Sequence, residues 1–449
     1  MIATQPLTLP DVPAVKHPST EKSTSGPSTR SRQRLYLVLF LCAFLLRFGF
    51  MLWRKTYVLP AARTAEVSSI AAHLASGKGF SSPFGIDTGP TAWVAPAYPY
   101  FVSLVFRVFG IHSPMSRAVV LSLQCLMAAG IPIAIYALGK RTVGERIGMW
   151  AAWIWTLSPI FFRWPTSWMW DFTASALLLS LLLILTLDLA NEGNTKLWLR
   201  FGALWGLVAL VNPALLSLLP LTMAYAAFAN HRGKRQWLRG LVLAGSLFLA
   251  IISPWLIRNA IVFRQPVFLR SNYWFEFHLG NYHYSNGMGF GGKHPAGNPL
   301  ELAKYARLGE LRYIQDAKNN ALQFIHEYPG EFLSLTLHRI VWFWDGTPLL
   351  YEPGTWWSPW EFWPLSCAGL LGLLFVLTRR KRGWFLYASA LLIYPLPYDL
   401  AFASSRYRHA IEPELVLLAV YLASVLWGEI RLAGGRFTSS PQQTSQARA

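Results

Sequence analysis

The stretch LYLVLFLCAFLLRFGFMLW, residues 35–53, is apolar apart from a single arginine. As an α-helix it is long enough to cross a hydrocarbon core about 30 Å thick, which takes roughly 20 residues. A second stretch, SALLLSLLLILTLDLA at residues 175–190, is similarly rich in leucine. Because backbone polar groups in lipid must be satisfied within their own segment, both stretches are predicted to be membrane-spanning helices.

The composition of the whole chain agrees with this prediction. Of the 449 residues, 53% are hydrophobic and 14% are charged, whereas soluble domains average about 25% charged residues. Cys42, Cys125 and Cys367 all fall within apolar stretches, so neither a disulfide framework nor a zinc site is expected. The sequence therefore predicts an all-α polytopic membrane protein.

The basic residues gather in short loops between the apolar stretches. The chain has 40 Lys and Arg against 21 Asp and Glu, a formal charge of +19, which alone would suit a nucleic-acid-binding protein. The basic loops lie at residues 140–146, 232–239 and 379–382. Such loops stay in the cytoplasm during membrane insertion. The charge therefore indicates orientation, and no nucleic acid partner is expected.

Placing the basic loops in the cytoplasm predicts about ten spans in the cytoplasmic membrane, with both chain ends in the cytoplasm. The predicted spans are residues 35–53, 117–139, 147–162, 169–190, 198–211, 214–230, 238–258, 361–378, 384–398 and 411–428. The apolar stretch at residues 97–110 is not counted, because counting it would put the loop at 140–146 outside. It is short and contains Pro99, so we expect a helix lying at the outer membrane surface.

This topology divides the chain into five parts. They are a disordered cytoplasmic arm (1–34), an N-terminal transmembrane module (35–258) that includes an external loop (54–116), an external helical loop region (259–360), C-terminal transmembrane helices (361–430) and a disordered cytoplasmic tail (431–449). The arm is rich in Ser, Thr and Pro, as disordered segments are. Most acidic residues that do not cap helices fall in the two external regions, so the chemistry is expected there.

The second external region contains a strong helix signal. Asn298 is expected to cap the helix, Pro299 to occupy its first position, and Pro329-Gly330 to end it. Residues at helical spacing are expected to form one face that packs on the membrane-embedded body. That face consists of Leu311, Ile314, Lys318, Ala321, Ile325 and Tyr328.

The first external region contains the most informative motif, RTAEVSSIAAHLASGKGFSSPFGIDTGPTAWVAPAYPY, at residues 63–100. If Thr64 caps a short helix, then Glu66, Ser69 and His73 share its polar flank. Glu66 then lies in the first turn, where the helix dipole favours the ionised carboxylate. Such a carboxylate can accept a proton from an incoming hydroxyl. The alternative is a solvated amphipathic helix whose glutamate serves only as an N-terminal charge.

The chain resembles the GT-C superfamily of glycosyltransferases. The resemblance starts from an acidic residue in the first external loop followed by IAAHLASGKGF, and is closest to uncharacterised bacterial members that carry GPTAW and an APxYP element. Further matches are LRSNYWFEFHLGN at 269–281, HRIVWFW at 338–344 and SRYRHAIEP at 405–413. The superfamily includes the protein O-mannosyltransferases and the lipid A aminoarabinose transferase, which use a polyprenyl-phosphate-linked sugar. The resemblance rests on the order in which these motifs follow one another along the spans.

The resemblance implies an inverting transfer, in which an acceptor hydroxyl attacks the anomeric carbon and the polyprenyl phosphate leaves. Glu66 matches the family's catalytic acid, commonly an aspartate, and is expected to be the general base. Asp171, in RWPTSWMWDFTAS at 163–175, matches a position where relatives often have Asp or Glu. It is expected to orient the acceptor or to help hold a divalent cation, a cofactor that the sequence leaves open. Alternatively, Asp171 only caps its helix.

The departing phosphate requires cations, and several basic residues are external in this topology. The candidates are Lys78, Arg270, Lys293, His294, Arg406 and Arg408. Arg406 and Arg408 are favoured, because RYRHAIEP resembles an external element of the relatives. Aminoarabinose transferases carry a basic residue one turn after the catalytic aspartate, where this chain has Ser69, so another residue has to supply that charge. The alternative for each candidate is a contact with solvent or lipid headgroups.

The remaining candidates concern the sugar and the acceptor. His73, Tyr98 and Glu276 are expected to contact one or the other. The aromatic stretch at 271–294 fits no metal-binding spacing and is expected to be an interfacial belt or a surface on which a sugar stacks. Arg47, inside the first span, is expected to extend toward the membrane surface.

The sequence favours an enzyme that works on the outer face of the membrane with lipid and a lipid-linked sugar donor as partners. The alternatives are a non-catalytic transporter or flippase of lipid-linked substrates and a structural protein that recruits partners. Charged residues deep within several spans, or an internal repeat, would favour transport. The sugar, the acceptor, the protein partners and the oligomeric state are left open.

Overall fold

The computed structural model describes residues 29–58, 65–230, 236–288, 292–346 and 362–438. Within these ranges the chain is helical and contains no strand beyond one isolated bridge between Ser81 and Pro90. The predicted all-α fold is confirmed.

The first ten helices are α1 (Thr29–Arg54), α2 (Ala65–Ala75), α3 (Ala97–Phe109), α4 (Pro114–Thr142), α5 (Glu145–Leu157), α6 (Arg163–Ser167), α7 (Phe172–Glu192), α8 (Thr195–Val211), α9 (Leu219–Asn230) and α10 (Gln236–Phe263). The others are α11 (Tyr273–Gly280), α12 (Pro299–Leu308), α13 (Glu310–Glu327), α14 (Pro329–Asp345), α15 (Phe362–Thr378), α16 (Trp384–Leu392), α17 (Leu396–Leu400), α18 (Ser405–Arg408) and α19 (Glu412–Thr438).

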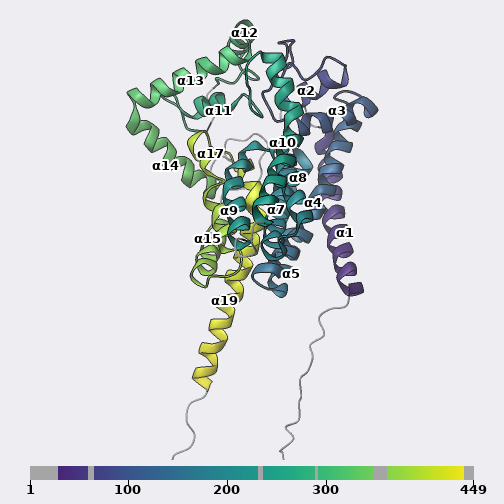
Figure 1. Ribbon diagram of the computed structural model, residues 1–449, viewed down its shortest axis with the longest axis vertical. Helices are drawn as coiled ribbons and strands as arrows, with labels where there is room; N and C mark the ends of the chain where they lie inside the picture. Colours follow the sequence, from purple (N-terminus) through teal and green to yellow (C-terminus); the bar gives the residue numbers. More distant parts are fainter. Residues whose placement is uncertain (1–28, 59–64, 231–235, 289–291, 347–361, 439–449) are drawn as a thin grey trace, which may run out of the picture.

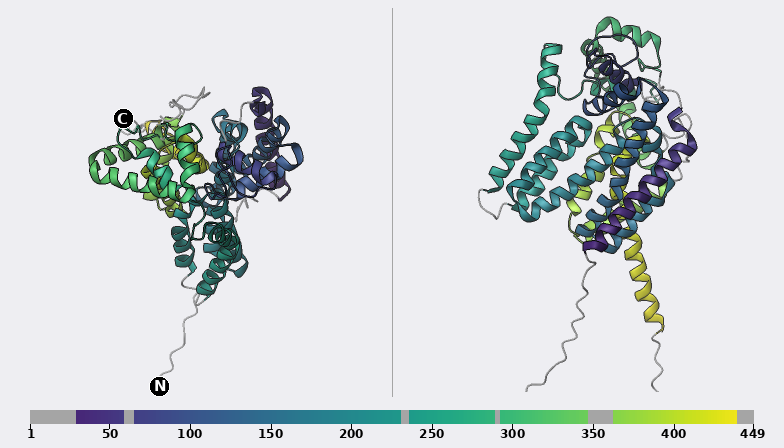
Figure 2. Two further views of the ribbon diagram at one scale, coloured as in Figure 1. Left: turned by 90° about the horizontal axis from the view of Figure 1, so that it is seen from above. Right: turned by 90° about the vertical axis from the view of Figure 1, so that its right-hand side faces the viewer.

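The helices form a bundle with a cap of shorter helices at one end. Figure 1 shows α2, α3, α11, α12 and α13 gathered at that end, while the first residues of α1 and the last of α19 lie at the other. Seen from above in Figure 2, α1–α3 and α12–α14 lie on opposite sides, and α8–α10 form a third side. The capped end is therefore where distant parts of the sequence meet.

A helix or a pair of helices occupies each of the ten predicted spans. Among the described residues, five stretches are long and apolar enough to cross a membrane: Gln33–Arg54, Pro114–Thr142, Phe172–Glu192, Trp237–Phe263 and Ser405–Glu429. Other predicted spans are divided where proline interrupts helical hydrogen bonding. Short 3-10 helices begin at Pro159, after α5, and at Pro213, before α9. The protein is thus an integral membrane protein in which some predicted spans are broken helices.

The apolar stretch at residues 97–110, which was not counted as a span, forms the predicted helix, α3. It lies beside α2 at the capped end (Figure 1). Its buried face includes Tyr98, Val102 and Phe106, whereas Leu104 and Val108 are 62% and 74% exposed. Exposed apolar side chains of this kind suit a helix that lies against lipid. Its position at the outer membrane surface stays a prediction.

Arg47 corrects one expectation. Its side chain is fully buried instead of extending to the surface. The guanidinium donates to the carbonyl oxygen of Trp155 over 3.0 Å and lies 4.7 Å from the centre of the Phe162 ring. The last carbonyls of a helix have no partner within the helix. Arg47 supplies hydrogen-bond donors to these carbonyls at the end of α5. This role could not be predicted from the position of Arg47 along its own helix.

The predicted boundaries differ from the structure at three places. Helix α1 begins at Thr29 and α19 continues to Thr438, so both extend into ranges predicted to be disordered. The rest of those ranges, and Thr64, lie outside the described residues. Asn298 caps α12 as predicted, but Gly309, with a φ of +74°, ends that helix and a second one follows. Glycine adopts this backbone conformation without steric cost.

The buried face of α13 differs from the predicted one. Its buried residues are Glu310, Tyr313, Ile314, Ala317, Ala321 and Phe324. Ile314 and Ala321 are common to both faces, whereas Tyr328 is exposed. The face is therefore rotated, and an acidic residue that the sequence did not single out becomes part of the interior.

Candidate active site

Six ionisable residues from five separate segments interact at the capped end of the bundle. They are Glu66, Asp171, Arg270, Glu276, His294 and Arg406. The charge of Arg406 acts on Glu66, Asp171 and Glu276 alike, and that of Arg270 acts on both Asp171 and Glu276. All six are candidates from the sequence, and the fold brings them together.

Glu66 and His294 form an ion pair in which Nε2 of the imidazole lies 3.2 Å from Oε1 of the carboxylate. Their side chains are 16% and 26% exposed, so a small substrate group can reach them. Burial alone would raise the pKa of Glu66, but the hydrogen bond and charge of His294 lower it overall. Burial likewise opposes protonation of His294, yet Glu66 and Glu276 raise its pKa. Each group therefore favours the charged form of the other, a carboxylate beside an imidazolium.

Glu276, on α11, lies near this pair and is half-buried. Burial is the largest cause of its raised pKa, and the negative charge of Glu66 adds to it. His294, Arg270 and Arg406 oppose the rise. The side chain of Asn272 donates to Oε1 over 2.8 Å. Two neighbouring carboxyl groups thus have pKa values shifted in opposite directions, an arrangement found where one acid must stay ionised beside another.

Asp171 occupies the N-cap position of α7, but its side chain makes no capping hydrogen bond. Instead it accepts from Ser175 Oγ over 3.2 Å, and Ser175 in turn accepts from the side chain of Asn212 over 3.0 Å. Helix capping alone therefore does not account for the Asp171 carboxylate. Its side chain is held toward the group of charges described above.

Ser69 has a structural contact, and the positive charge near the carboxylates belongs to Arg270 and Arg406. Ser69 Oγ donates to the carbonyl oxygen of Ser82 over 2.7 Å and accepts from the backbone N–H of Gly85, so it stabilises the loop after α2. Arg406 lies over the ring of Tyr407, 5.1 Å from its centre, and donates to its hydroxyl over 3.2 Å. The positive charges near the carboxylates thus come from arginines of distant segments.

Two of the phosphate candidates, Lys78 and Lys293, have other neighbours. Lys78 lines a separate pocket with Asp87 and Arg258. Lys293 lies over the ring of Tyr282 at 4.2 Å. These contacts do not place either lysine against Glu66.

Arg408 was expected to bind the phosphate, but its side chain is fully buried and cannot reach solvent. It donates to the carbonyl oxygen of Trp344 over 3.1 Å, lies over the Phe362 ring and is 3.9 Å from Glu412. Alternate residues of a short helix point in different directions, so Arg406 faces the site and Arg408 the helix packing.

The three residues predicted to contact the sugar or the acceptor lie in different surroundings. His73 lies 3.2 Å from the Ser81 hydroxyl through Nδ1, in the loop after α2. Tyr98 is buried and donates to Gln124, although the charge of Asp171 acts on it. Of these candidates, Glu276 lies among the interacting charges described above.

Glu310 is a buried acidic residue that the sequence analysis missed. Its carboxylate accepts from the Thr91 hydroxyl, from the Ala92 N–H over 2.8 Å, from the Ser271 hydroxyl over 2.7 Å and from the Tyr305 hydroxyl over 2.9 Å. A buried carboxylate requires such donors. The signal for it was the GPTAW motif, whose threonine hydroxyl needs an acceptor, but the sequence did not indicate which one.

The GPTAW tryptophan forms part of an aromatic frame around His294. The rings of Trp93 and Phe275 are 4.8 Å apart, and Phe275 and Phe84 lie 5.3 and 5.7 Å from the imidazole. Glu310 holds Ala92, next to this tryptophan, and Ser271, next to Arg270. One carboxylate therefore fixes two segments that carry site residues.

A divalent cation was left open by the sequence. Among the described residues, no group of three or more His, Cys, Asp or Glu side chains is arranged to hold a metal ion. Glu66 is already paired with His294. Within the described part of the chain, the carboxylates of this site are therefore not arranged as a set of metal ligands.

Residues 93–257 match the family model for dolichyl-phosphate-mannose-protein mannosyltransferases. No curated protein sequence matches the chain significantly. The fold resembles that of the Archaeoglobus fulgidus oligosaccharyltransferase in its apo form, at 13% identity and a TM-score of 0.51 over 94% of this chain and 53% of that one. The same enzyme tethered to an acceptor peptide containing the NVT sequon gives 14% identity and a TM-score of 0.51 over 90% and 51%. The chain thus spans about half the length of that enzyme.

A third solved structure is ArnT from Cupriavidus metallidurans bound to undecaprenyl phosphate. It has 12% identity over 93% of this chain and 82% of that one, with a TM-score of 0.39.

Proposed function

We propose that this chain is a glycosyltransferase of the GT-C superfamily, an inverting enzyme that moves a sugar from a polyprenyl-phosphate donor to a hydroxyl acceptor. The family match over residues 93–257 and the fold shared with the oligosaccharyltransferase support this proposal. The reaction takes place on the extracytoplasmic face of the cytoplasmic membrane. Glu66 is the general base, and Arg270 and Arg406 bind the departing phosphate.

One observation carries the proposal: the ionised Glu66 and His294 pair lies within the electrostatic reach of Arg406. A proton acceptor and a cation are the two groups that transfer from a phosphate requires. Arg270 and Arg406 suit phosphate because a guanidinium can donate two parallel hydrogen bonds. The orientation predicted from the basic loops places this group outside the cytoplasm.

In the proposed step, the acceptor oxygen forms a bond to the anomeric carbon as the bond between that carbon and the phosphate oxygen breaks. The phosphate leaves with the bonding electron pair, and its charge is stabilised by Arg270 and Arg406. The hydroxyl proton passes to the Glu66 carboxylate. The attack comes from the side opposite the phosphate, so the configuration inverts.

His294 orients Glu66 in this scheme. Its hydrogen bond occupies Oε1 of the carboxylate, which leaves the second oxygen for the acceptor hydroxyl. Glu276, whose raised pKa favours the protonated form, donates a hydrogen bond to the sugar or acceptor. Asp171 orients the acceptor from the start of α7.

The proposal is tested by a transfer assay with the purified protein and a panel of undecaprenyl-phosphate sugars. Glu66→Gln should lower the turnover by about 10²–10⁴-fold, the usual contribution of a positioned base. Glu331→Gln is the matched control, because Glu331 also pairs with a histidine, His283, over 3.0 Å but on the exposed surface. Equal turnover of Glu66→Gln and wild type would overturn the assignment of the base.

The transporter alternative rests on charged residues within the spans. Arg47 is hydrogen-bonded to backbone carbonyls, and His409 lies 2.7 Å from Glu412 at the start of α19. Internal pairing of this kind also stabilises a helix bundle, so it does not favour transport. Exchange of lipid-linked sugars between vesicles without any sugar transfer would support the transporter instead.

A further inference from the structure

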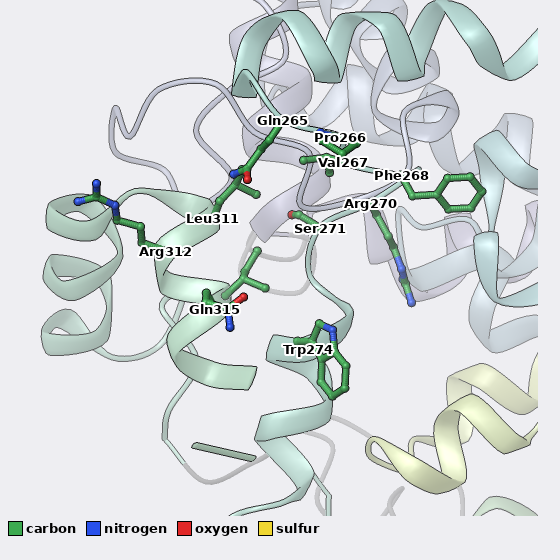
Figure 3. Close-up of a pocket in the computed structure, with 11 residues that line it drawn as sticks. Gln265, Pro266, Val267, Phe268, Arg270, Ser271, Trp274, Leu311, Arg312 and Gln315 are labelled. Atoms are coloured by element: carbon green, nitrogen blue, oxygen red, sulfur yellow. The ribbon is translucent and has the colours of Figure 1, made fainter. Parts of the chain in front are cut away.

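A cavity of about 640 Å³ opens between the segment before α11 and helix α13. Figure 3 shows Gln265 and Leu311 close together at one end, Trp274 at the other, and Ser271 and Gln315 on facing walls. The volume lies within the range of about 300–1,000 Å³ that is typical of small-molecule sites. The cavity is large enough for a sugar.

The lining combines an aromatic ring, apolar side chains, neutral polar groups and two arginines, Arg270 and Arg312. Trp274 is half-buried, Val267 and Ile314 are buried, and Gln265 and Gln315 are exposed amides. In Figure 3 the side chain of Arg312 points away from the cavity, and that of Arg270 extends away from α13. Apolar faces with a few neutral donors and acceptors match a neutral saccharide, which has C–H faces and hydroxyl edges.

The wall formed by residues 265–271 is fixed by hydrogen bonds to its backbone and to Ser271. Trp255 Nε1 donates to the carbonyl oxygen of Leu269 over 2.7 Å, and the Asn259 side chain donates to that of Phe268 over 3.1 Å. The Ser271 N–H donates to the carbonyl oxygen of Ala92 over 2.8 Å, and its hydroxyl is held by the buried Glu310. The wall is thus built before any ligand binds, which lowers the entropic cost of binding.

The cavity adjoins the proposed active site along one segment, residues 270–276. Arg270 lines the cavity and also acts on Glu276 and Asp171. Trp274 lines the cavity from α11, the helix that also carries Glu276. A saccharide in the cavity therefore lies beside the segment that carries Arg270 and Glu276.

We propose that this cavity is the acceptor subsite and that the acceptor is a neutral saccharide chain, whose terminal unit stacks on Trp274. The inference rests on the proposed function, since it identifies the class of acceptor for the same site. Transfer of one sugar to such a chain forms a new glycosidic bond and releases the polyprenyl phosphate, as in the step above.

The test measures binding and transfer separately. Wild type in nanodiscs is titrated with maltotetraose, cellotetraose, chitotetraose and mannotetraose by saturation-transfer-difference NMR, which needs no donor. We expect one or more to bind. Trp274→Ala, which removes the ring, and Gln315→Trp, which fills the cavity from its exposed wall, should each weaken binding about tenfold.

Gln323→Trp is the matched control. Gln323 is also an exposed glutamine of α13 and bonds to the residue four positions later, as Gln315 does, but it is not part of the cavity. Its variant should bind like wild type. In the transfer assay, the KM for the acceptor should rise in the two cavity variants while the KM for the donor stays unchanged.

Three results would overturn the inference: no saccharide binds wild type, the cavity variants bind as tightly as the control, or only a serine-containing peptide or a lipid acceptor is used. Trp274→Ala could unfold, but Gln315→Trp changes an exposed residue and keeps the test decisive. If saccharide binding depends on the cavity and yet wild type transfers no sugar from any donor, the proposed function fails while the saccharide site stands.

Discussion

Nε2 of His294 lies 3.2 Å from Oε1 of Glu66, although the two residues belong to different external regions of the sequence. Each shifts the pKa of the other toward its charged form, and burial opposes both shifts. The pairing makes Glu66 a fixed, ionised carboxylate, which is the state that a general base requires.

The first prediction concerns pH. The pKa of Glu66 lies below the ordinary value of about 4.3 and that of His294 above the ordinary value of about 6.5. Ionised Glu66 stabilises the folded protein at pH values above the pKa that it has in the unfolded chain. This contribution is lost as the pH falls through its lower pKa in the folded protein. The stability from His294 is present below its unfolded pKa and lost as pH rises through its folded pKa. The ion pair should therefore be strongest between about pH 4.3 and 6.5.

Replacing His294 with asparagine tests this balance. Burial raises the pKa of Glu66, and without the imidazole this effect is less opposed. The pKa should therefore rise, and the acid limb of the pH profile of kcat/KM should move to higher pH. His283→Asn, at the exposed pair with Glu331, should leave the profile unchanged. An acid limb at the wild-type pH in His294→Asn would contradict the coupling.

The second prediction concerns the arginines. Arg406→Gln should lower kcat by about 10²–10³-fold, the usual effect of removing a donor to developing charge. Arg406→Lys should recover part of it, because lysine keeps the charge but loses the planar pair of donors. Arg307→Gln, at an exposed position of α12, is the control. Steady-state kinetics with a saturating acceptor would measure the effect, and unchanged kcat in Arg406→Gln would rule out contact with the phosphate.

The third prediction concerns Glu310. Glu310→Ala leaves buried donors of Thr91, Ser271 and Tyr305 without their acceptor, at a cost of about 1–3 kcal/mol for each unsatisfied group. A clear drop in the melting temperature in detergent is expected. Glu301→Ala removes the acceptor of a single tyrosine, Tyr313, and should have a smaller effect. Equal melting temperatures for the two variants would contradict the role of Glu310.

The fourth prediction concerns helix packing. A Cβ atom at Gly372 on α15 would collide with the carbonyl oxygen of Leu418 on α19. Gly372→Ala should therefore destabilise the bundle by about 1–3 kcal/mol, as overpacking does. At Gly245 on α10, a Cβ atom meets nothing within 4 Å, so Gly245→Ala should be neutral or slightly stabilising. Thermal unfolding monitored by circular dichroism compares the two, and a neutral Gly372→Ala would contradict the close contact.

The sequence predicted most helices and singled out several residues that the structure brings together in the candidate site. Glu66 was found because it follows directly from local rules: an acidic residue in the first turn of a helix within an external loop. Asp171 and Arg406 were found through a family resemblance. The partners of these residues could not be predicted, because a contact between Glu66 and His294 depends on how two external regions pack together.

The errors have the same origin. Arg47 was expected at the surface from its depth in one helix, but its donors go to carbonyls of another helix. Arg408 was expected beside Arg406, but it is buried under Trp344 and Phe362. Glu310 was missed, because its four donors come from three segments. Each outcome was decided by neighbours that are distant in the chain.

By itself, the sequence determined that residues 35–53 and the other long apolar stretches are helices within a membrane, since backbone groups in lipid have to bond within their own segment. That constraint is local, so a single stretch of sequence reveals it. The tertiary structure alone decided which charges meet at Glu66, because burying a charged group requires partners, and the chain brings those partners from wherever the packed helices place them.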